Sequence, residues 1–252
     1  FGNRSALIEG FGPILQAGLF TDGMVAVIES GILERVRVGG NKKPMATWAS
    51  PAVGNWQYAV LGVDTLGRLY LADPFQNNLT IYDSLGHVID TIRGVAPSLM
   101  APTDDGGMAG IVQRGKTLEI QIIYPGDSGK STKLNWPAVP TAVAMTQNGH
   151  LAVAFPDGSV AKAEPTKWSL HPLLPANTSR HIRSIAANPH DPSHLWLLDE
   201  KGQQVLSYQE KTEELTPILS ECDGGFIFPY GEGIYYISQK GKRAILTSNG
   251  SA

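Results

Sequence analysis

A short sequence pattern recurs along the chain at nearly constant intervals. In each copy, a turn and a glycine or serine lead into a short apolar run that is typical of a β-strand. The copies begin at Gly23, Gly67, Gly107, Gly149, Ser193 and Gly233, with spacings of 44, 40, 42, 44 and 40 residues. This period is typical of repeat units that each contain four short strands. The repeat therefore predicts an all-β protein made of similar four-stranded units.

Six copies with a mean spacing of 42 residues account for all 252 residues, and we expect one domain over residues 1–252. The predicted fold is a six-bladed β-propeller of four-stranded antiparallel blades. The expected blades span residues 14–49, 58–93, 97–135, 139–173, 182–219 and 224–248. The last blade has room for only three strands. We therefore expect an N-terminal strand at residues 5–9 to complete it and to remove the free edges.

One unit carries a resemblance to a known repeat family. It reads Gly67-Arg-Leu-Tyr-Leu-Ala-Asp73, followed by Asn77, Ile81-Tyr-Asp83 and Gly86. This order of residues resembles the NHL-type propeller repeat, and the likeness covers this unit well and the others only at the glycine and the strand that follows it. The resemblance implies a propeller blade, and it favours binding of a partner over catalysis.

The composition excludes several classes of protein. Charged residues make up only 17% of the chain, and the net charge is −3 with no basic block, so we expect no nucleic-acid partner. No apolar run reaches the length of about 18 residues that a membrane-spanning helix needs. The single cysteine, Cys222, excludes an intramolecular disulfide and a thiolate zinc cluster. The 28 glycines and 17 prolines are consistent with many tight turns.

Two motifs suggest chemistry that their context does not support. Residues 126–131 read Gly-Asp-Ser-Gly-Lys-Ser and resemble the end of a phosphate-binding loop, but Tyr124 stands where that loop needs its first glycine. We interpret this segment as a tight turn between outer strands. His190 and His194 have the spacing of a helical zinc pair, but Asp191-Pro192 between them breaks a helix.

Some six-bladed propellers hold a metal ion in the axial channel and act as lactonases or esterases. Such an ion needs several oxygen ligands, and the predicted first strands of the blades here are almost free of carboxylates. The entrance loops offer only three potential oxygen ligands, Asn55, Glu221 and Asp223. We therefore predict no catalytic residues, no metal and no cofactor, and keep a metal-dependent hydrolase as an alternative.

The candidate binding surface consists of the segments that cross between blades and the turns between second and third strands. A cationic patch is predicted at Arg180, His181 and Arg183, and aromatic anchors at Trp56 and Trp136. Asp73, Asp157 and Asp199 recur at the second-to-third turn. They either stabilise these turns or form an acidic rim for a basic partner.

Four Asn-x-Ser/Thr sequons occur, at Asn3, Asn78, Asn177 and Asn249, and Asn78 and Asn177 are the candidate glycosylation sites. The chain begins with Phe1 and not Met, as a protein does after removal of a signal peptide. We expect an extracytoplasmic protein, secreted or periplasmic. The favoured function is a non-catalytic scaffold that binds a protein partner in a larger assembly. Recognition of a glycan or small ligand at the channel mouth is a further alternative.

Overall fold

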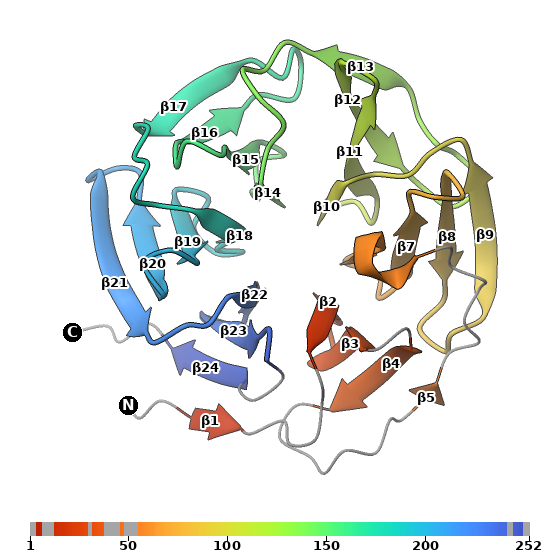
Figure 1. The fold of residues 1–252 in the computed structure, drawn as a ribbon, viewed down its shortest axis with the longest axis horizontal. Helices are drawn as coiled ribbons and strands as arrows, with labels where there is room; N and C mark the ends of the chain where they lie inside the picture. Colours follow the sequence, from red (N-terminus) through yellow and green to blue (C-terminus); the bar gives the residue numbers. More distant parts are fainter. Residues whose placement is uncertain are drawn as a thin grey trace. The chain divides into compact units, whose positions relative to one another are not determined.

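A computed structural model describes residues 4–6, 13–29, 32–37, 46–47, 55–240 and 244–248. Over these residues the secondary structure consists of β-strands and one short 3-10 turn, η1 (Trp56–Tyr58), with no α-helix. No helix in the described part is long and apolar enough to cross a membrane. The strands form four-stranded antiparallel sheets (Figure 1), and the chain divides into two compact units, residues 8–135 and residues 1–7 with 136–252.

The unit of residues 8–135 contains three sheets, in each of which the strands are ordered as in the sequence. The first sheet has β2 (Ile14–Leu19), β3 (Met24–Glu29), β4 (Ile32–Arg37) and β5 (Ala46–Thr47). The second has β6 (Val60–Val63), β7 (Leu69–Asp73), β8 (Asn78–Tyr82) and β9 (Val88–Arg93). The third has β10 (Leu99–Pro102), β11 (Met108–Arg114), β12 (Thr117–Ile123) and β13 (Ser131–Leu134).

The other unit also contains three sheets. One has β14 (Ala142–Met145), β15 (Leu151–Ala154), β16 (Val160–Ala163) and β17 (Leu170–Leu174). The next has β18 (Ile182–Ala187), β19 (His194–Asp199), β20 (Gln204–Gln209) and β21 (Glu214–Ser220). The last has β22 (Gly225–Tyr230), β23 (Gly233–Ser238), β24 (Ala244–Ser248) and β1 (Arg4–Ala6).

Burial within a sheet changes from its second strand to its fourth. All five residues of β7 are buried, whereas β9 alternates between exposed and half-buried positions. The core lies between neighbouring sheets of a unit, where Tyr70 and Ile81 of one sheet pack with Met108 and Ile123 of the next. Burial of apolar surface on both faces of the second and third strands is the main stabilising contribution.

The predicted all-β propeller of four-stranded antiparallel blades is confirmed. In the sheet that begins at β2, the fourth strand is described only at Ala46–Thr47, and residues 38–45 and 48–54 lie outside the described part. The predicted count of six blades and the single domain stay predictions.

The N-terminal strand pairs with the last blade as expected. Ser5 of β1 lies opposite Ile245 of β24 in an antiparallel register. The strand covers residues 4–6 and not 5–9, and residues 7–9 lie outside the described part. The sequon residues Asn3 and Asn249 also lie outside it. Residues 126–130 lie in the turn between β12 and β13, as predicted, and Ser131 is the first residue of β13.

Candidate functional site

The crossing segments and the second-to-third turns lie on one side of their sheets, which we call the loop face. Three backbone hydrogen bonds of the same kind join these two sets of loops. In each, an N–H of the crossing segment donates to a carbonyl of the second-to-third turn of the same sheet. The pairs are Gly94 to Asn77 (2.7 Å), Asn177 to Asp157 (2.8 Å) and Cys222 to Gln203 (2.8 Å). The two kinds of loop that were predicted from the sequence to form the binding surface therefore lie together in each of these three sheets.

The three aspartates of the loop face are occupied by hydrogen bonds within the fold. Oδ1 of Asp73 accepts from the N–H groups of Phe75 (2.9 Å) and Gln76 (3.2 Å), and Oδ1 of Asp199 accepts from the N–H of His181 (2.9 Å). Asp73 and Asp199 are only 3% and 2% exposed, so neither presents its charge to solvent. Asp157 is exposed, and the hydroxyl of Ser159 that donates to it lowers its pKa. This geometry is that of turn stabilisation, and an acidic rim stays a prediction.

The three residues of the predicted cationic patch, Arg180, His181 and Arg183, have different surroundings in the structure. A guanidinium nitrogen of Arg180 donates to the carbonyl of Pro175 at 2.8 Å. Nδ1 of His181 lies 3.1 Å from a carboxylate oxygen of Glu200, which places a negative charge beside the ring. Arg183 is the extra residue of a bulge in β18, between the pairs of Ile182 and Ser184.

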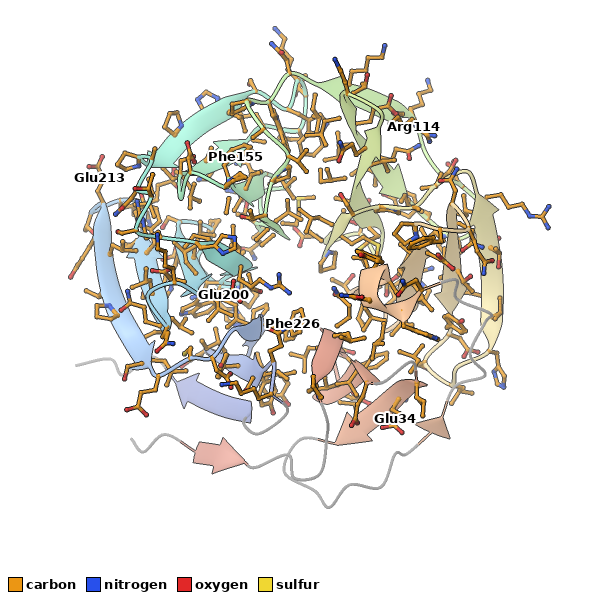
Figure 2. The ribbon with its side chains drawn as sticks, in the orientation of Figure 1. Glu34, Arg114, Phe155, Glu200, Glu213 and Phe226 are labelled. Atoms are coloured by element: carbon orange, nitrogen blue, oxygen red, sulfur yellow. The ribbon has the colours of Figure 1, made fainter. Side chains whose placement is uncertain are left out.

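The two predicted tryptophan anchors contribute to the packing of loops. Trp56 is half-buried and packs against the core shared by the first two sheets. The indole N–H of Trp136 donates to the carbonyl of Trp168 at 2.8 Å. The Trp136 ring meets that of Phe155, a residue labelled in Figure 2, edge-on with 6.2 Å between the ring centres. Both rings are held by the fold and present only part of their surface.

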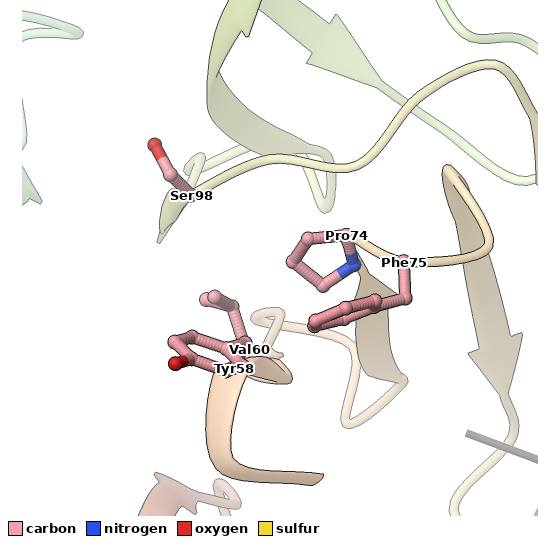
Figure 3. Close-up of a pocket in the computed structure, with 5 residues that line it drawn as sticks. All are labelled: Tyr58, Val60, Pro74, Phe75 and Ser98. Carbon is pink, nitrogen blue, oxygen red and sulfur yellow. The ribbon is translucent and has the colours of Figure 1, made fainter. Parts of the chain in front are cut away.

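An apolar pocket lies on the loop face of the sheet β6–β9. Its volume is about 470 Å³, and it is lined by Tyr58, Val60, Pro74, Phe75 and Ser98. Figure 3 shows the rings of Tyr58, Pro74 and Phe75 gathered on one side and Ser98 on the segment that leads into β10. Tyr58 is 54% exposed and Phe75 63%, with 5.6 Å between their ring centres. Exposure of a single apolar side chain is common on protein surfaces, but here two exposed rings lie side by side around a concavity and form a contiguous apolar patch.

Local hydrogen bonds hold both aromatic residues of the pocket in place. The side chain of Asn55 accepts from the N–H of Gln57 at 3.0 Å and caps the turn that carries Tyr58. The carboxylate of Asp73 fixes the turn that carries Phe75, and Pro74 restricts the backbone between them. Because the rings sit on capped turns, the pocket is preformed, and the protein would lose little conformational entropy when a ligand binds.

The sequence interpretation did not find Tyr58 or Phe75. It selected tryptophans near crossing segments. The exposed ring of Tyr58 belongs to the same 3-10 turn as Trp56, and the exposed ring of Phe75 belongs to the turn that follows Asp73. A signal was present in the Asp73-Pro-Phe75 order, because an aromatic residue inside a turn has no strand neighbours to cover it.

A histidine and a serine are paired on the opposite side of the sheet β18–β21, but not as a nucleophile and its base. Asn188 Oδ1 accepts from the N–H of His190 at 2.9 Å, which turns its amide nitrogen toward Nδ1 of His194, 3.1 Å away. Nδ1 of His194 must then accept, and Nε2 donates to the hydroxyl of Ser207 at 2.7 Å. An activated serine needs the reverse arrangement. No group of three or more His, Cys, Asp or Glu side chains able to hold a metal occurs among the described residues.

No protein-family model and no curated protein matches the chain. Solved structures match it as a fold. Virginiamycin B lyase from Staphylococcus aureus aligns at 12% identity over 98% of this chain and 99% of that one, with a TM-score of 0.68. YCF48 bound to a D1 peptide aligns at 12% identity over 95% and 79% (TM-score 0.63), and the WD40 repeats of RRP9 at 14% over 92% and 79% (TM-score 0.63). At these identities the likeness shows the fold alone.

Proposed function

We propose that this chain is a non-catalytic propeller module that binds a segment of a partner protein on its loop face. The observation that carries the proposal is the preformed apolar pocket between Tyr58 and Phe75. Exposed aromatic rings around a concavity are the usual anchors of protein interfaces. The structural neighbours include a propeller with a bound peptide and a WD40 protein, which is consistent with this role.

The chemistry of the pocket favours an apolar side chain over a sugar. The rings of Tyr58 and Phe75 are inclined at 48° to each other and form a cleft, not the flat platform on which a sugar stacks. The hydroxyl of Ser98 donates to the carbonyl of Ile111 at 3.2 Å and is thus already occupied as a donor. A glycan needs several converging polar groups, whereas an aliphatic or aromatic side chain needs the apolar walls present here.

Other parts of the proposal extend the sequence predictions. The module would have six NHL-like blades, the last completed by β1, and would work outside the cytoplasm as part of a larger assembly. Asn177 is exposed on the loop face, whereas the amide nitrogen of Asn78 donates to Gln76 at 3.2 Å. We therefore expect glycan addition at Asn177 before Asn78, measured by mass after expression through a eukaryotic secretory route. A protein of unmodified mass would count against this location.

The test of binding is selection from a library of random dodecapeptides displayed on phage. Wild-type protein should enrich peptides that share an aliphatic or aromatic anchor, and Phe75→Ala should bind them at least about tenfold more weakly. Because Phe75 is 63% exposed, the variant should keep its melting temperature. Leu85→Ala is the matched control, since Leu85 is 69% exposed in the turn between β8 and β9, at the opposite end of the sheet.

The competing functions give different outcomes in the same design. Failure to enrich any peptide, or equal binding by Phe75→Ala, would contradict the proposal. Specific binding on a glycan array would support the carbohydrate alternative. Retention of one equivalent of a divalent cation after dialysis, together with esterase or lactonase activity that depends on it, would support the hydrolase.

A further inference from the structure

Three exposed basic side chains lie on the loop face, one on the outer strand of the pocket's sheet and two at the second-to-third turn of the next sheet. They are Arg93 at the end of β9, Arg114 at the end of β11, and Lys116 in the turn between β11 and β12, and we call them the basic cluster. Nε of Arg114 lies 3.3 Å from a carboxylate oxygen of Glu119, whose side chain is only 12% exposed. One largely covered carboxylate therefore stands against three exposed cations, and the cluster is net positive.

Gly94 connects the basic cluster to the turn that carries Phe75. Its carbonyl accepts from Arg114 Nη2 at 2.9 Å, and its N–H donates to the carbonyl of Asn77 at 2.7 Å. Asn77 is two residues after Phe75 in the same turn. The backbone of Gly94 is thus bonded on one side to the basic cluster and on the other to the wall of the pocket.

The crossing segment of residues 94–98 runs from the basic cluster to the pocket. It starts after Arg93 on the fourth strand of one sheet and ends at Ser98, which lines the pocket before the first strand of the next. Its residues Val95 and Pro97 are buried, and the N–H of its Ser98 donates to the carbonyl of Ile111 at 2.8 Å. The segment is therefore a fixed floor between the two features.

The distance between the features sets the spacing that a ligand must have. A four-stranded sheet has three intervals of about 4.8 Å between its strands, so the fourth strand lies roughly 14 Å from the first. An extended peptide advances about 3.3 Å per residue, so about four residues cover that distance.

We propose that the bound partner segment is acidic, with an apolar anchor in the Tyr58–Phe75 pocket and carboxylates about four residues away on the basic cluster. This inference rests on the proposed function and adds the charge and spacing of the partner. The protein as a whole carries a net charge of −3, so attraction of an acidic segment must come from this local cluster. Such attraction is screened by salt.

The test uses fluorescein-labelled synthetic peptides with one leucine, a Gly-Ser spacer of three residues and three glutamates, made in both chain directions. Matched peptides carry three lysines in place of the glutamates, or serine in place of the leucine. Wild-type protein should bind one glutamate peptide at least about tenfold more tightly than its lysine counterpart at low salt, and the difference should shrink at 0.5 M NaCl.

Charge-reversal variants locate the effect. The double variant Arg93→Glu, Lys116→Glu should lose the preference for glutamate while keeping its melting temperature, because both side chains are exposed. Lys167→Glu, Lys211→Glu is the matched control, since these exposed lysines lie in turns of the other unit. This control should keep the preference.

The outcomes separate this inference from the proposed function. If leucine peptides bind equally well with glutamates or lysines, and Phe75→Ala still weakens them, the acidic partner is wrong and the pocket stands. If Phe75→Ala has no effect on any peptide, the proposed function itself fails. Loss of the glutamate preference in the Lys167, Lys211 variant would also overturn the assignment to the basic cluster.

Discussion

Asp64 and Arg68 form a partly buried ion pair, in which Nε of Arg68, whose side chain is 22% exposed, donates to Oδ2 of the carboxylate at 2.6 Å. Oδ1 of Asp64 also accepts from the N–H groups of Leu66 (2.9 Å) and Arg68 (2.8 Å). Asp83 repeats this arrangement in the turn between β8 and β9 of the same sheet, where it accepts from the N–H groups of Leu85 and His87, both at 2.9 Å. The two turns differ in burial, because the Asp64 side chain is fully buried and that of Asp83 is 34% exposed.

Replacement of these two aspartates should therefore have unequal effects. Asp64→Ala leaves the Arg68 guanidinium without its partner and two backbone N–H groups without an acceptor, at a cost of about 3 kcal/mol or more in free energy of unfolding. Asp83→Ala should cost clearly less, because water can replace the lost acceptor. Urea unfolding of both variants measures the difference, and equal losses would show that burial does not set the strength of this turn.

Glycine is required at Gly158 for two reasons, and at Gly149 for one. Both have positive φ angles, of 78° and 72°. A Cβ atom at Gly158 would lie 2.2 Å from the carbonyl oxygen of Asn177, whereas at Gly149 nothing lies within 4 Å. Gly149→Ala should cost about 1–2 kcal/mol from backbone strain alone. Gly158→Ala adds a clash with the crossing segment and should cost about 2–5 kcal/mol.

Thermal unfolding of the two glycine variants gives this comparison directly. Gly158→Ala should have the lower melting temperature. Hydrogen exchange should also rise at Asn177, whose N–H donates to Asp157 in the same contact. Equal melting temperatures would mean that the loops relax freely and that the loop face is not rigid there.

The environment of His194 predicts that stability falls in mild acid. Burial lowers the pKa of His194 from 6.5, and the nearby Asp191 opposes this shift. The unfolded chain therefore binds a proton at higher pH than the folded chain does, so this residue lowers stability as the pH falls below about 6.5. Hydrogen bonds from Ser193 and Gln209 lower the pKa of Asp191 to about 2, so its own contribution is lost only in much stronger acid.

His194→Gln isolates this effect, because glutamine is uncharged at every pH and the other histidines are unchanged. The melting temperature of the wild type should fall more steeply between pH 7.5 and pH 5.5 than that of the variant. The variant should be less stable at pH 7.5, since the contacts with Asn188 and Ser207 are altered. Parallel pH profiles would contradict the assignment of a neutral, buried His194.

The strands could be predicted from sequence because their signals are local. β18 begins at Ile182, the first residue of the blade expected at residues 182–219, and residues 126–130 lie in the turn between the outer strands as expected. The ends of strands were harder to predict from sequence where a capping side chain stabilises a turn in place of the strand. Tyr58, placed at the start of a strand, belongs to η1 because Asn55 caps that turn.

The binding surface was harder to predict because exposure depends on residues far away in sequence. Trp136 is partly covered through a contact with Trp168, 32 residues later, and Asp199 is occupied by the N–H of His181, 18 residues earlier. Phe75 has a local signal in its position after Asp73-Pro, whereas no such signal separates Tyr58 from Trp56 in the same turn, although Tyr58 is the more exposed of the two. Residue type selected aromatic and charged candidates, and tertiary packing decided which of them reach solvent.

The pairing of β1 with β24 predicts that the N-terminal residues stabilise the last blade from the outside. Deleting residues 1–7 would leave the backbone groups of β24 that face β1 without partners and create an exposed edge. The melting temperature should fall, and the protein should self-associate in size-exclusion chromatography. A synthetic peptide of residues 1–12 should reverse both effects, whereas the same peptide with Ser5→Pro, which cannot donate at the centre of the strand, should not. A truncated protein that stays monomeric and melts at the wild-type temperature would show that β1 contributes nothing to this blade.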